Sequence, residues 1–218
     1  MKIINFKSEP KNSPFAPEWD FFLAEQKIKD VDFKKLFLFL KGKEKNILKI
    51  KIDSKKKNVD GYTGLGDNST TSRYGQYNVF NWKNKELVKL KKNIIKLHND
   101  YLNYLSIKPS KNVFISCWFN VIKKNQRINT HLHGVNPDSY LSGNICVSTE
   151  GTSTYYINPV NVINDPVVYK SKNEEGKITL FPSKIPHYTD VYLGKEDRLT
   201  IAFDLFLISN RDKVIKLI

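Results

Sequence analysis

The sequence predicts an α+β, mainly β fold, in which a helical N-terminal half packs against a C-terminal β-sandwich, jelly roll or barrel. A chain of 218 residues, 40 % of them hydrophobic, can form one domain with a packed core. Before Pro109 the longest patterned stretch has helical periodicity, and after Pro109 the chain changes to short β-rich runs separated by turn residues. We therefore expect a single domain over residues 1–218, with a helical and loop-rich portion at 1–110 and a β core at 111–210.

The N-terminal portion is expected to contain an extended arm and two helices. Residues 1–17 hold three prolines among polar residues, which leaves room for at most one short strand. From Asp30 apolar residues recur at helical spacing, and Gly42 is expected to interrupt this short helix. Residues 85–105 form the clearest amphipathic helix. Its His98 lies beside the apolar stripe and is expected to be a packed or surface histidine.

A long polar loop precedes this second helix. Four of the ten glycines fall between Gly61 and Gly75, among Ser, Thr and Asn. The spacing Gly61-x-x-Gly64-x-Gly66 resembles a phosphate-binding turn, but no apolar strand precedes it and no helix begins directly after it. We expect a flexible loop instead, and a candidate lid together with the turn at residues 151–154.

The C-terminal portion contains seven short runs with β character. Because no helices separate them, they favour a sandwich, jelly roll or barrel. The expected strands are residues 113–122, 140–147, 154–157, 167–170, 177–181, 187–192 and 198–208.

Composition narrows the class of protein. Lys and Arg number 36 against 22 Asp and Glu, a net charge of +14 that suits nucleic acid or anionic partners. Only four of the 36 are Arg, the side chain that nucleic-acid recognition favours, so a solvated lysine surface is the preferred interpretation and nucleic acid stays possible.

No apolar run is long enough to span a membrane and the N-terminus lacks a signal-peptide core, so we expect a cytoplasmic protein. Cys117 and Cys146 form no C-x-x-C pair, which argues against disulfides and structural zinc.

Histidine is scarce, and three of the four histidines lie in the β-rich portion. In an extended segment His131 and His133 point to the same side, and His187 begins another strand 54 residues later. A jelly roll can bring these strands together. Three imidazoles on one side of a metal ion leave positions open for substrate, which favours catalysis. The alternative is that His131 and His133 are turn residues and His187 is a core histidine.

The last expected strand, residues 198–208, begins with a cationic residue, Arg198. Arg198 and Thr200 share a face of that strand, so together they could bind one carboxylate. An inward guanidinium needs such an anionic partner, because burying it unpaired is costly. The alternative is an outward Arg198 paired with Asp197 or Glu196.

These motifs together resemble the iron(II)- and 2-oxoglutarate-dependent oxygenases, in particular a prolyl-hydroxylase-like branch common in bacteriophages and marine bacteria. The resemblance spans about residues 113–207, with the polar loop and the second helix also similar to phage members. The residues that carry it are Trp118-Phe119-Asn120-Val121, His131-Leu132-His133, Tyr140-Leu141-Ser142-Gly143, Phe181-Pro182-Ser183, Pro186-His187 and Arg198-Leu199-Thr200-Ile201-Ala202-Phe203.

The resemblance implies a double-stranded β-helix, or jelly roll, with Fe(II) held at its mouth by His131, His133 and His187. It implies that Arg198 and Thr200 bind the distal carboxylate of 2-oxoglutarate, and it adds Asn120 and Tyr140 to the cosubstrate site. The implied reaction is hydroxylation of an unactivated C–H bond, with a peptide or protein side chain as the first candidate substrate. If the chain is phage-encoded, the host cytoplasm is the expected location.

Two departures from the family pattern stand out. The usual motif is H-x-D or H-x-E with a distal histidine, whereas this chain has His133 at the carboxylate position, so Asp138 or Asp190 could supply the missing carboxylate. Cys146 stands where relatives have a tyrosine, for which Tyr140, Tyr155 or Tyr188 could compensate. Two alternatives therefore stay open: a three-histidine cupin-like metalloenzyme that does not use 2-oxoglutarate, and a basic nucleic-acid-binding protein.

Overall fold

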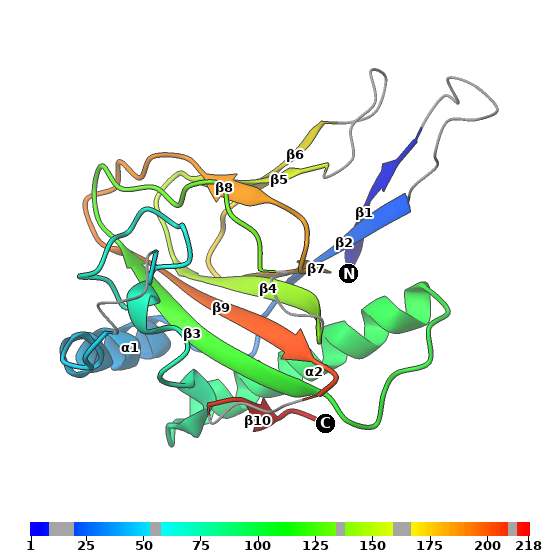
Figure 1. Cartoon of the computed structure of the whole chain (residues 1–218), viewed down its shortest axis with the longest axis horizontal. Helices are drawn as coiled ribbons and strands as arrows, with labels where there is room; N and C mark the ends of the chain where they lie inside the picture. Colours follow the sequence, from blue (N-terminus) through cyan, green and yellow to red (C-terminus); the bar gives the residue numbers. More distant parts are fainter. Residues whose placement is uncertain (9–19, 53–57, 134–137, 159–166, 209–212) are drawn as a thin grey trace.

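The described part of the chain forms two antiparallel β-sheets and two long helices (Figure 1). The computed structural model describes residues 1–8, 20–52, 58–133, 138–158, 167–208 and 213–218. The helices are α1 (Phe33–Leu48) and α2 (Lys85–Tyr104), with short 3-10 helices η1 (Thr71–Arg73) and η2 (Val79–Asn81). The strands are β1 (Lys2–Lys7), β2 (Asp20–Lys27), β3 (Phe114–Ile122), β4 (Ser139–Ser148), β5 (Ser153–Ile157), β6 (Val168–Lys172), β7 (Lys177–Pro182), β8 (His187–Thr189), β9 (Arg198–Phe206) and β10 (Ile215–Lys216). The α+β, mainly β class is confirmed.

The strands divide into a large and a small sheet. The large sheet has the order β1-β2-β7-β4-β9-β3-β10, and the small sheet has the order β6-β5-β8. Strand β9 lies between β3 and β4, with Asn120 and Cys146 both opposite Thr200. Sequence-distant strands therefore meet at β9.

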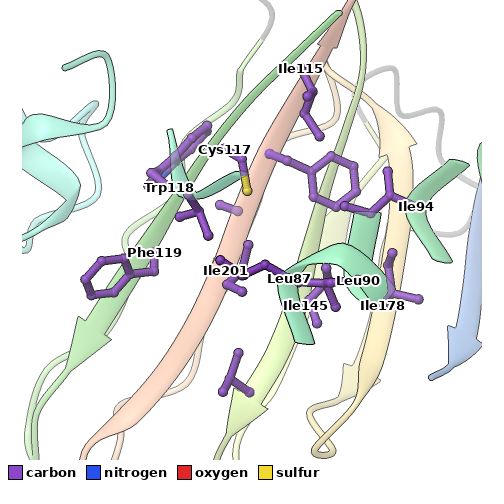
Figure 2. Packing of buried hydrophobic residues seen from close by; sticks show 14 of the residues in the cluster. Leu87, Leu90, Ile94, Ile115, Cys117, Trp118, Phe119, Ile145, Ile178 and Ile201 are labelled. Atoms are coloured by element: carbon purple, nitrogen blue, oxygen red, sulfur yellow. The ribbon is translucent and has the colours of Figure 1, made fainter. Parts of the chain in front are cut away.

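One face of the large sheet is covered by the helices. Helix α2 lies against this face, with Leu87, Leu90 and Ile94 directed toward the sheet (Figure 2). They join a buried cluster that includes Cys117 and Ile201 from the strands. Each such side chain contributes about 1.5–3 kcal/mol on full burial. The helices do not cover the opposite face of the large sheet, which forms a wall of the cavity described below.

The two helices begin at side-chain caps. The Asp32 carboxylate accepts a hydrogen bond from the Lys35 amide, and the Asn84 side chain accepts from the amides of Glu86 and Leu87. The Glu86 carboxylate also accepts from the Asp32 amide at 2.9 Å, which ties the start of α2 to the start of α1. Neither of these described helices is long and apolar enough to cross a lipid bilayer.

Two expectations for the N-terminal portion need correction. Helix α1 continues through Gly42 to Leu48, because Leu36, Leu40 and Ile47 are buried and one exposed glycine costs only about 1 kcal/mol. Strand β2 was not expected; it pairs with both β1 and β7 and extends the large sheet. Of the expected arm, β1 is the one short strand, and its three prolines lie outside the described residues.

The seven expected C-terminal strands are confirmed as β3 to β9, with ends that differ by a few residues. The largest difference is at β8, which ends at Thr189 instead of residue 192. There Asp190 turns its carboxylate to the Ser153 amide (2.9 Å), and the chain leaves the small sheet.

Candidate functional site

A cavity of about 610 Å³ lies between the two sheets and the polar loop. Its walls come from the face of the large sheet opposite the helices, from β8 and from residues 58–63 and 71–76. The lining includes His131, His133, His187, Arg198, Thr200 and Asn120. Six of the seven site residues expected from the sequence therefore lie around one space.

The three histidines converge at one point of this cavity. Their ligand nitrogens all lie within 4.8 Å of one another. Two backbone hydrogen bonds join His131 and His187, at 3.1 Å from the His131 amide and 2.9 Å from the His187 amide, so the segment holding His131 runs antiparallel along β8. His133 then points to the same side two residues later.

Each imidazole has its Nδ1 atom bonded to an oxygen. His131 Nδ1 lies 2.9 Å from the Asn129 carbonyl, and His187 Nδ1 lies 3.1 Å from the Ile185 carbonyl. Since a carbonyl only accepts, both Nδ1 atoms carry the proton and both Nε2 atoms have a free lone pair. His133 Nδ1 lies 2.6 Å from Asp204 Oδ1, and since a carboxylate accepts, this Nδ1 atom also carries a proton.

The resulting arrangement is suited to a cation. His133 Nε2 and His131 Nε2 face each other at 3.2 Å, close enough for both atoms to bind one metal ion. Burial, reinforced by the neighbouring histidines, lowers the pKa of His131 to about 4 and also lowers the pKa of His187. Both are neutral at neutral pH, the form that binds metal.

Arg198 lies in the same cavity and is 2 % exposed. Its Nε and Nη1 atoms have no hydrogen-bond partner within the described part of the chain. Burial lowers the pKa of the guanidinium, although an arginine stays charged at any physiological pH. An unpaired buried cation of this kind indicates an anionic ligand.

A short chain of hydrogen bonds orients the hydroxyl next to Arg198. Thr71 Oγ1 donates to Asn120 Oδ1 (2.7 Å), which fixes the amide, and Asn120 Nδ2 donates to Thr200 Oγ1 (3.3 Å). Because Thr200 accepts this bond, its own hydroxyl proton is free to donate into the cavity. Asn120 thus orients the Thr200 hydroxyl toward the cavity.

The polar loop is anchored at the mouth of the cavity. The buried Arg73 guanidinium donates to the carbonyls of Leu48 and Ile50 at 3.1 Å, and also to the carbonyls of Asp67 and Ser69. The Asp60 carboxylate accepts from the Gly66 amide at 3.0 Å. The movement of this loop as a lid stays a prediction, as does that of the turn at 151–154, of which Thr154 lines the cavity.

Tyr140 is the expected site residue that does not line the cavity. Its hydroxyl is hydrogen-bonded to His98 Nε2 on α2, on the helical side of the sheet. His98 is fully buried, in agreement with the packed alternative.

The other two tyrosines considered, Tyr155 and Tyr188, stack on each other with ring centroids 4.8 Å apart. By strand alternation they face away from the cavity, whereas the neighbouring Tyr156 faces inward, with its ring 5.7 Å from that of His187. The Tyr156 hydroxyl accepts from Asn144 Nδ2 at 2.8 Å. The same alternation, applied to β5, could have selected Tyr156 from the sequence.

The carboxylate nearest the histidines is Asp204, which the sequence analysis missed. Asp138 and Asp190 do not belong to the metal-binding group found among the described residues. The period-two pattern that pairs Arg198 with Thr200 continues through Ala202 to Asp204, and all four line the cavity. Following that pattern to the end of the strand would have found Asp204.

Comparison with known proteins finds a family model that matches the part of the chain that holds this site. A family model described as "Putative 2OG-Fe(II) oxygenase" matches residues 116–204. Similar solved structures include a Pseudomonas putida prolyl-4-hydroxylase, with a TM-score of 0.53 and 10 % identity over 86 % of this chain and 93 % of that chain. A Trichoplax adhaerens prolyl hydroxylase, solved with a hypoxia inducible factor peptide fragment, has a TM-score of 0.55 and 12 % identity over 85 % and 83 %.

A third similar structure is the viral collagen prolyl hydroxylase of Paramecium Bursaria Chlorella virus-1 in complex with 2OG, with a TM-score of 0.52 and 11 % identity over 85 % of this chain and 96 % of that chain. At these identities the solved structures establish a shared fold. No curated protein gives a significant match to the sequence.

The fold and the site define a class of protein: a double-stranded β-helix with a cluster of metal-competent histidines at its mouth. Residues 116–204 of the chain match the 2OG-Fe(II) oxygenase family model, and the chain shares its fold with the prolyl hydroxylase structures. The cofactors of this family are Fe(II) and 2-oxoglutarate, and the residues present fit both. The three clustered imidazole nitrogens suit Fe(II), and the unpartnered nitrogens of Arg198 suit a carboxylate. The phage and marine branch stays a prediction.

Proposed function

We propose that the protein hydroxylates an unactivated C–H bond of a peptide or protein side chain, using Fe(II) held by His131, His133 and His187. The observation that carries the proposal is the combination, in one cavity, of three convergent imidazoles with a buried guanidinium whose Nε and Nη1 atoms have no partner among the described residues. A metal-only enzyme would have no need for Arg198. Bound together, Fe(II) and 2-oxoglutarate activate dioxygen and couple decarboxylation of the cosubstrate to C–H hydroxylation.

In this proposal Arg198 and Thr200 bind the distal carboxylate of 2-oxoglutarate. The guanidinium supplies charge and two donors, and the Thr200 hydroxyl proton, left free by Asn120, supplies a third donor. Tyr156 and Phe181 pack against His187 with ring centroids at 5.7 and 4.8 Å, and they keep the metal-facing end of the cavity apolar. This wall limits the access of water to the site.

The substrate would enter past an aromatic rim. The Trp118 ring lies 5.6 Å from the His133 ring and 5.5 Å from the Tyr74 ring, so aromatic surface runs from the histidines to the polar loop. Tyr62 on the same loop is 67 % exposed. Flat apolar surface next to loop carbonyls suits a short peptide segment. The peptide bound to the Trichoplax hydroxylase and the collagen hydroxylase activity named for the viral protein support this substrate class.

The test is an anaerobic titration of metal-stripped protein with Fe(II) and then 2-oxoglutarate. We expect the visible charge-transfer band of the bidentate chelate in the wild type. The band should be lost in His187→Ala through loss of metal, and lost in Arg198→Met with metal binding retained. His98→Gln, which changes the histidine outside the cavity, is the matched control and should keep the band.

The outcomes also separate the alternatives. Fe(II) binding without a band, together with unchanged behaviour of Arg198→Met, would favour the three-histidine cupin-like enzyme. Absence of metal binding, combined with DNA or RNA binding that falls steeply with salt, would favour the basic nucleic-acid-binding protein. If the band forms, succinate release in the presence of candidate peptides then tests the substrate class.

A further inference from the structure

His133 differs from the other two histidines in what its Nδ1 atom contacts. The Nδ1 atoms of His131 and His187 donate to neutral backbone carbonyls, whereas His133 Nδ1 donates to the Asp204 carboxylate at 2.6 Å. His133 also occupies the position at which the usual facial triad has its carboxylate ligand. His133, which stands in the place of the carboxylate ligand, is therefore the histidine that is hydrogen-bonded to a carboxylate, Asp204.

We propose that Asp204 is a positioning residue that supplies, through His133, the negative charge missing from the first coordination sphere. The proposal rests on the proposed function, because it assumes that His133 Nε2 binds the metal. A carboxylate acceptor at Nδ1 increases the electron density at Nε2 and holds the ring in one orientation, and removing such an outer partner typically weakens metal binding 10–100-fold.

The Asp204 side chain is itself held in place. Ser142 Oγ donates to the same Oδ1 atom at 2.7 Å and lies 2.8 Å from Ser183 Oγ. Ser142 and Ser183 are both buried, and the Asp204 side chain is 13 % exposed. The carboxylate is therefore fixed on the imidazole by strands β4 and β9, and it does not depend on a flexible surface contact.

Asp204 is set back from the metal position. The group of ligand atoms within 4.8 Å of one another consists of the three histidines and does not include this carboxylate. Its Oδ1 atom already accepts from His133 and Ser142. The charge therefore reaches the metal through one imidazole, which keeps a three-nitrogen first sphere with the carboxylate one residue further out.

A double-mutant cycle between positions 133 and 204 tests the proposal. The probe is Co(II) alone, titrated into metal-stripped protein and followed by its visible d–d absorption. We expect Asp204→Asn to weaken Co(II) binding 10–100-fold, because asparagine keeps an acceptor for Nδ1 and removes the charge. In a His133→Asp background the charge is supplied directly, so Asp204→Asn should change the affinity less than threefold or improve it.

The matched control is Asp190→Asn, the same substitution at a carboxylate that accepts from the Ser153 amide instead of an imidazole. It should change Co(II) affinity less than twofold. Equal losses from Asp204→Asn in both backgrounds would overturn the proposal and make Asp204 a structural residue. A loss below threefold in the wild-type background would also overturn it and would leave the histidine site intact. Absence of Co(II) binding by the wild type would overturn the proposed function and this inference together.

A second measurement needs no variant and covers the case in which Asp204→Asn fails to fold. Nitrogen NMR of the metal-free wild type at pH 8 reports which imidazole nitrogen carries the proton. We expect the His133 proton on Nδ1, facing Asp204. A proton on Nε2 would overturn the proposal.

Discussion

At the residue scale, the buried Arg198 is expected to lower the stability of the ligand-free protein. The guanidinium is buried with two nitrogens unpartnered in the described structure, and a buried unsatisfied polar group costs about 1–3 kcal/mol, more when charged. We therefore expect Arg198→Met to raise the free energy of unfolding of the ligand-free protein by about 1–3 kcal/mol while abolishing 2-oxoglutarate binding. Urea denaturation and calorimetric titration measure the two effects.

Arg73 provides the control for this prediction. It is also buried, at 7 % exposure, but its guanidinium donates to the Leu48, Ile50 and Ser69 carbonyls at 3.1 Å. Arg73→Met leaves these carbonyls without their donor and should destabilise the protein, the opposite sign for the same substitution. If Arg198→Met destabilised the ligand-free protein as Arg73→Met does, the guanidinium would have a structural role.

For single residues, the sequence predicts those site residues whose spacing follows the alternation of side chains along a strand. His131 and His133 two apart, and Arg198 and Thr200 two apart, follow from the alternation of a strand. Asp204 obeys the same rule two steps beyond Thr200, at the far end of β9. The contact of Tyr140 with His98 joins β4 to α2, so it depends on tertiary packing, which no local pattern encodes.

At the scale of the element, Gly143 in the middle of β4 permits a close approach of neighbouring strands. A methyl group at this position would lie 2.2 Å from the Phe203 ring and 2.6 Å from the Thr179 carbonyl. We expect Gly143→Ala to lower the free energy of unfolding by about 1–3 kcal/mol, because the backbone must shift to admit the methyl group. Urea denaturation midpoints at constant m-value provide the measurement.

Gly42 in α1 is the matched position for the same substitution. A methyl group there would have no neighbour within 4 Å, and the residue is exposed inside a helix. Gly42→Ala should therefore stabilise the protein by up to about 1 kcal/mol, since alanine is the better helix former. A stabilising Gly143→Ala, or a destabilising Gly42→Ala, would contradict this account of the two glycines.

The strands and helix α1 show why the sequence predicts some ends of elements and not others. The strands from β3 to β9 were predicted because β-branched and aromatic runs alternate with turn residues. The end of α1 was placed too early because Gly42 is a local signal, whereas the burial of Ile47 that overrides it is a tertiary one. Strand β2 was missed because its pairing partner β7 lies some 150 residues later in the sequence.

At the scale of the whole molecule, the N-terminal elements and the jelly roll share their hydrophobic packing. Strand β2 pairs directly with β7, and Phe6 and Leu23 pack in one buried cluster with Tyr156 and Phe181. Tyr156 and Phe181 are also the aromatic residues against His187. Loss of the N-terminal strands would therefore uncover the aromatic wall beside His187, which leads us to expect one cooperative unit over the chain.

Calorimetry tests both the cooperative unfolding of the chain and the binding of metal and 2-oxoglutarate. We expect one endotherm whose calorimetric and van't Hoff enthalpies agree. Ligands that bind only the folded state at 100 times their Kd contribute about 2.7 kcal/mol each, which for a chain of this size shifts Tm by roughly 5–10 °C. Co(II) should move the whole endotherm upward, and 2-oxoglutarate should move it further. In Arg198→Met the second shift should disappear while the first remains. Two endotherms, of which only one responds to the ligands, would instead show that the N-terminal portion and the jelly roll unfold as separate units.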